Sequence, residues 1–223
     1  MLQSYYEKSG RVFDAGVVAL SIANRQKTWD MKKKSLETAA KFFNGCRSTH
    51  HDSAAFAHNS VLSQIELLTR QHELEVQANS RGWANPPHHF MGLSLMETVR
   101  QVILKMEFQE ADNLQKVFKI PDKRYWRCKI DALADGQYFD ELLAFAQYRT
   151  SPVGYEPFVI ACLRNDQVNL AAKIIPKIKE AEQQAHWYRE LEMHEEAEAA
   201  LKNANSQSLG IFQTLTDALK GRR

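Results

Sequence analysis

KIPDKRYW at residues 119–126 and TSPVGYEPF at residues 150–158 are the two stretches that decide the fold of this chain. In each stretch a proline stands just before an amphipathic run. A helix begins readily there, because the first helical turn has no intrahelical use for the N–H that proline lacks. Each stretch also carries aromatic residues where two helices would meet. The same helix start, repeated about one helical hairpin later, predicts a stack of helix pairs.

A loose internal repeat supports this prediction. The second helix of each expected pair carries small or aliphatic residues at related positions, which are Ala111 and Leu114, Leu142 and Phe145, Ala171 and Ile174, and Ala197 and Leu201. Their spacing of about 26 to 31 residues falls in the lower part of the range for helical arrays. We therefore predict an all-α fold, an α-solenoid of stacked antiparallel helix pairs.

Apolar residues recur at helical spacing along most of the chain. The predicted helices cover residues 12–26, 30–44, 53–77, 94–106, 108–118, 123–134, 139–148, 157–163, 168–175, 179–191, 195–203 and 208–219. We expect the apolar or small face of the long helix 53–77 to include Phe56, Ser60, Ile65, Leu68 and Leu74. Ser94 and Glu97 have the spacing of a capping box, in which each side chain satisfies the other residue's exposed amide.

The strongest helix-breaking signal is SRGWANPP at residues 80–87. It separates an N-terminal helical part, residues 1–79, from a helical-hairpin array, residues 92–223, with a loop at residues 80–91. We interpret this signal as the border between two parts of one continuous α-solenoid, rather than as proof of two separate domains.

Composition and charge limit the classes of partner. The 223 residues are 44% hydrophobic and 25% charged, with nine glycines and six prolines, which favours a folded helical protein. A formal net charge of +2 gives no general attraction to nucleic acid, so we predict no nucleic-acid partner. No apolar run approaches the roughly 20 residues that span a bilayer, and the first residues lack the apolar core of a signal peptide. Membrane association is therefore expected to be peripheral, through partners.

No motif predicts catalysis, a metal or a cofactor. The pairs at residues 50–51 and 88–89 are adjacent histidines in loops, without a cysteine or an acid at ligand spacing. The glutamates between residues 180 and 198 form a solvated helix face, and phosphate-binding loops and nucleophile elbows are missing from the sequence. Cys46, Cys128 and Cys162 are expected to be buried, reduced thiols, which suits the cytosol. We predict that the chain is not an enzyme.

KRYWR at residues 123–127 is the candidate binding segment, because three cations flank two large aromatic residues at the first turn of a helix. Arginine, tyrosine and tryptophan dominate binding hot spots. We expect Trp126 to lie in the core and Asp122 to be a helix-start acid favoured by the helix dipole. The candidate partner-binding residues are Lys123, Arg124 and Tyr125, with Ser60 on the long helix as a second wall.

Several motifs in order resemble the C-terminal domain of the vacuolar protein sorting-associated protein 16 family. They are GLSL at residues 92–95, FKIPDKRYW at 118–126, ALA at 132–134 and SPVGYEPFV at 151–159. The upstream LETAA at residues 36–40 and the stretch from residue 67 to residue 75 also fit. The resemblance is strong from residue 92 to residue 163 and loose after it.

The resemblance implies an α-solenoid that holds a Sec1/Munc18-family partner, vacuolar protein sorting-associated protein 33, within the HOPS and CORVET tethering complexes. These complexes link endosomal, lysosomal or vacuolar membranes and assist SNARE assembly before fusion. A cytoplasmic protein, peripheral on late endosome and lysosome or vacuole membranes and bound to other HOPS or CORVET subunits, is therefore expected. The family's partner-facing surface falls here on Arg124, in the Pro-Asp-Lys-Arg motif, and on Ser60. Family members carry a β-propeller ahead of the solenoid, so we expect a C-terminal part of a longer protein.

Other interpretations stay open. The spermatogenesis-defective protein 39 homologue, a paralogue, resembles this domain and binds a sister Sec1/Munc18 protein, although residues 121–126 fit the first family more closely. An adaptor solenoid of another coat or cargo scaffold is a second alternative. A third is an enzyme, which a deep pocket lined by convergent ionisable groups would indicate.

Overall fold

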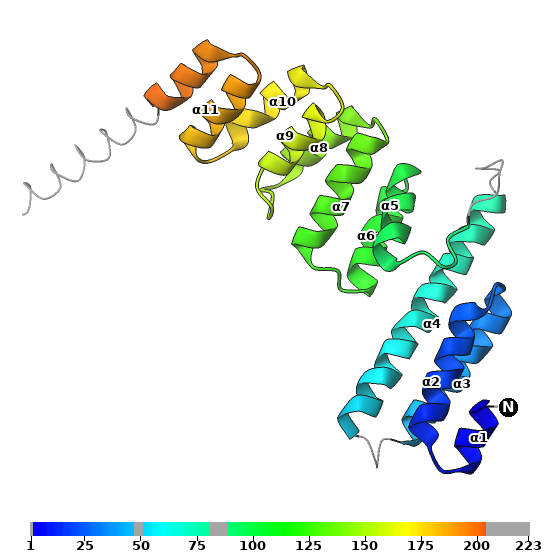
Figure 1. The fold of residues 1–223 in the computed structure, drawn as a ribbon. Helices are drawn as coiled ribbons and strands as arrows, with labels where there is room; N and C mark the ends of the chain where they lie inside the picture. The colour runs from blue at the N-terminus through cyan, green and yellow to red at the C-terminus, as the bar shows by residue number, and fades with distance from the viewer. Residues whose placement is uncertain (1, 47–50, 81–88, 204–223) are drawn as a thin grey trace, which may run out of the picture. The chain divides into compact units, whose positions relative to one another are not determined.

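The computed structural model describes residues 2–46, 51–80 and 89–203, and all regular elements within these ranges are helices (Figure 1). The predicted all-α fold is therefore confirmed. The helix predicted at residues 208–219, most of the breaker at residues 80–87 and the histidines at 50 and 88 lie outside the described residues. The chain divides into two compact units, residues 1–98 and 99–223.

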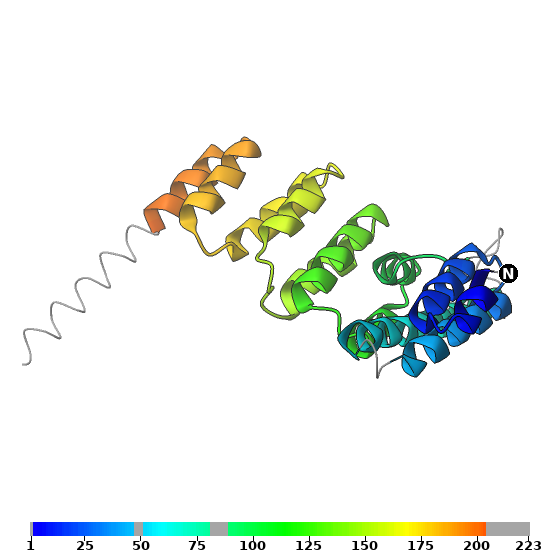
Figure 2. The ribbon, with the colours of Figure 1, turned by 60° about the horizontal axis from the view of Figure 1, so that its bottom comes forward.

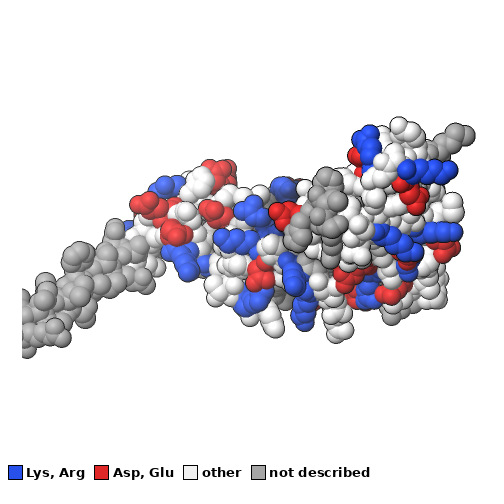
Figure 3. Space-filling view, turned by 90° about the horizontal axis from the view of Figure 1, so that it is seen from below, with Lys and Arg blue, Asp and Glu red and all other residues white. Residues whose placement is uncertain are grey.

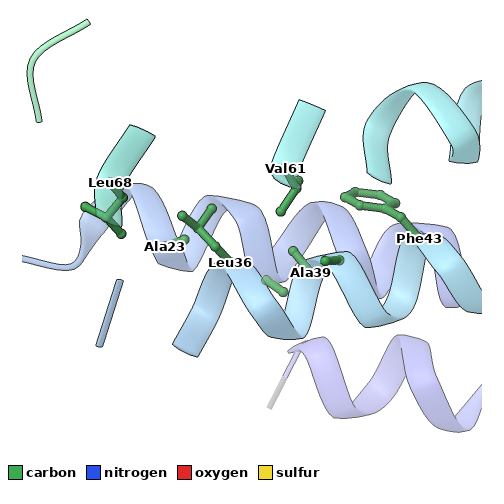
Figure 4. Packing of buried hydrophobic residues seen from close by; sticks show 8 residues of the cluster. Ala23, Leu36, Ala39, Phe43, Val61 and Leu68 are labelled. Carbon is green, nitrogen blue, oxygen red and sulfur yellow. The ribbon is translucent and has the colours of Figure 1, made fainter. Parts of the chain in front are cut away.

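The first unit is a helical bundle in which α3 (Trp29–Gly45) packs against both α2 (Val12–Arg25) and α4 (His51–Ser80), while α1 (Leu2–Lys8) packs against α2. Its core combines small residues with a few large ones, among them Ala23, Leu36, Ala39, Phe43, Val61 and Leu68 (Figure 4). A Cβ atom at Gly16 would lie 2.7 Å from the ring of Phe43, so glycine is what permits this close approach of α2 and α3.

The prediction that Phe56 shares one apolar face of α4 with Leu68 and Leu74 is wrong, since Phe56 is 76% exposed while the two leucines are buried. The residues of α4 that are buried are Ala54, Val61, Leu68, Gln71, Leu74 and Ala78. At about 100° per residue, Phe56 lies roughly 200° around the helix from Ala54. The helix therefore carries a large aromatic residue on the side opposite its core face.

The capping box predicted from Ser94 and Glu97 is confirmed at the start of α5 (Leu95–Leu104). The Ser94 amide donates to Glu97 Oε2 at 2.7 Å, and the Glu97 amide donates to Ser94 Oγ at 3.3 Å. The hydrogen bond from the Ser94 amide lowers the pKa of Glu97, because it favours the charged carboxylate. Nearby, the buried Gln71 side chain donates to the Leu93 carbonyl at 2.9 Å and to Thr98 Oγ1 at 2.8 Å, which ties α4 to this helix start.

The second unit is a row of helix pairs, and Figure 2 shows its successive helices stacked side by side. The elements after α5 are α6 (Phe108–Val117), α7 (Asp122–Asp135), α8 (Phe139–Tyr148), α9 (Glu156–Leu163), α10 (Val168–Ile174), the 3₁₀ helix η1 (Ile175–Lys177), α11 (Ala181–Glu190) and a helix at residues 194–203. α7 packs against α8 and α9, and α10 packs against α8 and α9. This arrangement is that of an α-solenoid, as the sequence predicts.

Five helices in this unit end in the same kind of turn. A residue other than glycine, with φ between 50° and 61°, follows each helix, and these residues are Met106, Lys119, Gln137, Asp166 and Glu192. At one of them, the Gln137 amide donates to the Ala134 carbonyl at 3.0 Å and the Tyr138 amide donates to the Leu133 carbonyl at 2.9 Å. The other four turns repeat these bonds three and five residues back, which is the Schellman pattern that satisfies the last carbonyls of a helix.

The turns also show the repeat directly. Met106, Gln137, Asp166 and Glu192 each stand two residues before the next helix begins, at steps of 31, 29 and 26 residues. The predicted repeat of about 26 to 31 residues is therefore confirmed in the backbone. The repeated unit is a helix, a left-handed turn residue and a second helix.

Gln137→Gly should stabilise the second unit by about 0.5 kcal/mol. The left-handed conformation costs a side-chain-bearing residue about 1–2 kcal/mol, and the greater freedom of glycine in the unfolded chain offsets part of the gain. Urea unfolding followed by circular dichroism measures the change. The matched control is Gln147→Gly inside α8, which should destabilise instead. Equal losses at both positions would contradict the role assigned to the turn.

Candidate partner-binding site

The candidate site begins where α7 starts. Pro121, with φ of −56°, precedes the helix, and its carbonyl accepts bonds from the Arg124 amide at 2.9 Å and the Tyr125 amide at 3.0 Å. Asp122 lies in the first turn, as predicted, where a carboxylate interacts favourably with the helix dipole. Its Oδ1 accepts a bond from Gln115 Nε2 of α6 at 2.7 Å. These contacts hold the first turn of α7 in place and so orient the side chains that follow.

Lys123 and Arg124 are exposed on this first turn. Within the described residues neither makes an ion pair or a side-chain hydrogen bond, so no acid of the part of the chain that the structure describes neutralises them. Arg127 lies one turn further along the helix and is also exposed. The start of α7 therefore presents cations on an ordered helix, which suits an acidic surface of a partner.

Tyr125, the remaining candidate on this turn, is only 2% exposed. Its hydroxyl donates to Asp112 of α6, and Lys129 Nζ lies 3.4 Å from the same carboxylate oxygen. Burial first, and then the bond to Asp112, raise the pKa of Tyr125, because both disfavour a phenolate. Tyr125 thus anchors α7 to α6, and a direct contact with a partner stays a prediction.

Trp126 is fully buried, which confirms the prediction that it belongs to the core. Its ring lies 4.1 Å from the Phe145 ring and 6.2 Å from the Phe158 ring, centroid to centroid. The guanidinium of Arg149 lies 5.1 Å above it. The two stretches that predict the fold therefore meet here, because Trp126 comes from the first stretch and Phe158 from the second.

Ser60, the predicted second wall, lies on α4 in the first unit and is half-buried beside the buried Val61. Arg124 lies in the second unit, so a site that combines Ser60 with Arg124 stays a prediction. The exposed Phe56 stands one helical turn before Ser60 and so shares its side of α4. The sequence prediction missed this aromatic residue as a candidate contact. The sequence of α4 alone does not mark it, because one helix does not reveal which of its sides meets the neighbouring helices.

The three cysteines match the prediction in part. Cys46 and Cys162 are buried, Cys128 is half-buried, and all three are thiols rather than disulfides. Burial raises the pKa of Cys128 and of Cys162 to about 11, because it disfavours the thiolate. Thiols with so few thiolates near neutral pH are poor nucleophiles.

Alkylation of Cys128 and Cys162 by iodoacetamide should be slow at about pH 8 and rise about tenfold per pH unit toward pH 10. Because their folded pKa of about 11 exceeds the ordinary 9.0, the unfolded chain loses these protons first. The contribution of these two thiols to the free energy of unfolding should therefore be fully present below about pH 9 and be lost as the pH rises toward 11. Mass spectrometry of the labelled peptides, with urea-unfolded protein as the fully reactive control, measures the rates. Fast labelling of the folded protein at about pH 8 would contradict this prediction.

Among the described residues no group of three or more His, Cys, Asp or Glu side chains is arranged to hold a metal ion. A hydrophobic helix that reaches across a bilayer is also missing from the described part of the chain. Figure 3 shows basic and acidic side chains on the same face, without one sign covering it.

Known proteins resemble this chain. The family model described as Vps16, C-terminal region, matches residues 1–221. The vacuolar protein sorting-associated protein 16 homolog of Dictyostelium discoideum is 34% identical over 150 residues, which cover 67% of this chain and 17% of that protein. The homolog of Drosophila melanogaster is 35% identical over 123 residues, covering 55% and 15%. The protein VACUOLELESS1 of Arabidopsis thaliana is 25% identical over 214 residues, covering 92% and 24%.

The chain therefore spans between 15% and 24% of the length of these relatives. The family match extends over nearly the whole chain, and it agrees with the motifs at residues 92–163 and with the helical repeat of the second unit. The resemblance noted in the sequence is confirmed. This chain belongs to the Vps16 family and corresponds to the C-terminal region of its members.

Proposed function

We propose that this chain is the scaffold region of a vacuolar protein sorting subunit and that it binds a Sec1/Munc18-family protein. The complex would act at endosomal and lysosomal or vacuolar membranes, where it positions its partner for SNARE-mediated fusion. The observation that carries the proposal is the pair of exposed cations, Lys123 and Arg124, on a helix start held by Pro121, Gln115 and the buried Trp126.

In the proposed mechanism, the stack of helices presents one face to its partner and positions it. An interface of this kind buries about 1,600 Å² in total, and a few aromatic and arginine residues supply most of its free energy. Because Tyr125 and Trp126 are packed inside the second unit, the first turn of α7 needs little ordering when a partner binds. Affinity is favoured when the binding residues are ordered beforehand. Other HOPS or CORVET subunits would bind elsewhere on the full protein, and membrane association would be peripheral, through such partners.

Co-expression with each Sec1/Munc18 paralogue of the vacuolar protein sorting-associated protein 33 type, followed by size-exclusion chromatography, tests the proposal. One paralogue should co-elute with the chain as a 1:1 complex. Preference for the sister paralogue would favour the alternative of an adaptor like the spermatogenesis-defective protein 39 homologue. If circular dichroism shows a folded helical chain and neither paralogue co-elutes, the proposal is wrong.

Ser60→Asp should weaken binding of the Sec1/Munc18 partner by about tenfold or more, because a charge would lose its hydration in a close contact. The half-buried position and the adjacent exposed Phe56 make this side of α4 the expected contact. Isothermal titration calorimetry measures the affinity. The control is Ser21→Asp, at an exposed position of α2 in the same unit. Unchanged binding by a folded Ser60→Asp variant would remove this side of α4 from the interface.

A further inference from the structure

A groove of about 480 Å³ opens between α6, α7 and α8 within the second unit. Its walls are strongly aromatic, with Phe108 from α6, Tyr125 and Trp126 from α7, and Phe145 and Tyr148 from α8. The volume suits one large side chain with its flanking backbone, since pockets for small molecules span about 300–1,000 Å³. Lys123 and Arg124 do not line this groove, so it is separate from these two exposed cations, although Tyr125 of the same helical turn forms part of its wall.

One of the two acids that line the groove, Asp112, is already paired within the chain. Asp112 accepts the hydrogen bond from the Tyr125 hydroxyl and pairs with Lys129 at 3.4 Å. Lys129 Nζ also lies 4.9 Å from the ring centroid of Phe145 and 5.5 Å from that of Phe108. The aromatic rings that would otherwise attract a foreign cation are thus occupied by a cation of the chain itself. A basic segment of a partner would have to displace Lys129.

Two further cations line the groove. Lys116 lies in the last turn of α6, and Arg149 stands at the end of α8. Within the described residues neither forms an ion pair. The Arg149 guanidinium stacks 5.1 Å above the ring of Trp126. A stacked guanidinium keeps N–H groups at its edge, where a carboxylate can accept two parallel bonds. Glu141 also lines the groove, in the first turn of α8, so the cations without an ion pair exceed the acid.

The groove also has an exposed apolar contact. Tyr148 is 83% exposed although its ring adjoins an aromatic cavity. An exposed tyrosine beside a pocket and an arginine is the combination typical of binding hot spots. Its position next to Arg149 in the sequence brings an aromatic and a cationic contact to the same end of α8.

We propose that this groove binds an extended acidic segment of a partner protein. One apolar side chain of the segment enters the aromatic cavity against Phe145 and Tyr148, and a neighbouring carboxylate binds Arg149 and Lys116. The charge of the lining favours an acidic segment, because Asp112 pairs with Lys129, while Lys116 and Arg149 form no ion pair within the described residues. The occupant is a short linear segment, since a groove of about 480 Å³ has the size of a small-ligand site and is too small to seat a whole protein face.

An array of synthetic nonapeptides, probed with the whole chain, tests the chemistry of the occupant. Each peptide carries a central Phe, Leu or Ser between Asp and Glu residues or between Lys and Arg residues. We expect the chain to bind the peptides with acidic flanks and a Phe or Leu centre. Equal binding of peptides with basic flanks, or no binding of any acidic peptide, would overturn the proposal. The array contains no Sec1/Munc18 protein, so its result is independent of the proposed function.

Variants then locate the binding surface, with the best acidic peptide labelled with fluorescein and its anisotropy measured. Arg149→Glu should weaken binding about tenfold or more, and Tyr148→Ala about fivefold, since charge-assisted and aromatic contacts dominate such interfaces. Lys173→Glu, an exposed cation on α10 outside the groove, should leave binding unchanged. As a second measurement, the indole N–H resonance of Trp126 should shift when peptide is added. Binding that Arg149→Glu does not reduce, or an unshifted Trp126 resonance, would overturn the proposal.

Discussion

Trp126→Ala should lower the free energy of unfolding of the second unit by about 3–5 kcal/mol. Trp126 is fully buried, and its ring packs against Phe145 and Phe158 from two different helices. Its removal would leave a cavity between α7, α8 and α9 and expose both rings. Among the described residues the indole N–H has no hydrogen-bond acceptor, so the loss comes from packing.

This loss is large compared with the total stability of a domain, which is about 5–15 kcal/mol. Urea unfolding monitored by the helical signal in circular dichroism measures it. Trp187→Ala on α11 is the matched control, because Trp187 is only half-buried and should lose less. If the two substitutions cost the same, Trp126 would not be the packing centre between these helices.

Arg124→Glu should weaken binding of the Sec1/Munc18 partner by about 30-fold or more while leaving the melting temperature unchanged. Loss of one member of an interfacial charge pair costs about 2 kcal/mol or more, which corresponds to this factor. The fold should not suffer, because Arg124 is exposed and forms no ion pair within the described residues. The affinity is measured by calorimetry, and the fold by circular dichroism.

Two controls separate charge from geometry in this experiment. Arg189→Glu, at an exposed position of α11, makes the same change of charge elsewhere in the second unit and should retain binding. Arg124→Lys keeps the charge but loses the planar fork of donors, so it should bind with intermediate affinity. If Arg124→Glu binds as tightly as the unchanged chain, the start of α7 is not part of the interface.

Helix positions were largely predictable from the sequence, because they depend on local signals. The pattern of apolar residues gave α8 at Phe139–Tyr148 with both ends correct, and the Ser94–Glu97 capping box formed as expected. α1 was missed, since none of its residues is buried and it leaves no apolar stripe to detect. The turns at Met106, Gln137 and Asp166 were also hidden, because no glycine stands at their left-handed positions.

In the candidate site, too, the features set by local sequence were predictable and those set by packing were not. Pro121 marks the start of α7, and the helical period places Lys123 and Arg124 away from the apolar side. Their exposure was therefore predictable from the sequence. The burial of Tyr125 was not, because it depends on Asp112 and Lys129, which only the packing of α6 against α7 brings near its hydroxyl. Phe56 was misplaced because one helix does not reveal which of its sides meets the neighbouring helices.

By itself, the order of residues determined that this chain is a series of short helices with defined beginnings and that it belongs to the Vps16 family. The start of a helix and its apolar period depend on residues only a few positions apart, so the amino-acid sequence alone is enough to predict them. Only the tertiary structure decided that Trp126 meets Phe158, that Phe56 faces outward, and that an aromatic groove lined by Lys116 and Arg149 opens between α6, α7 and α8. These features arise where distant segments pack, and packing depends on the shapes of both surfaces at once.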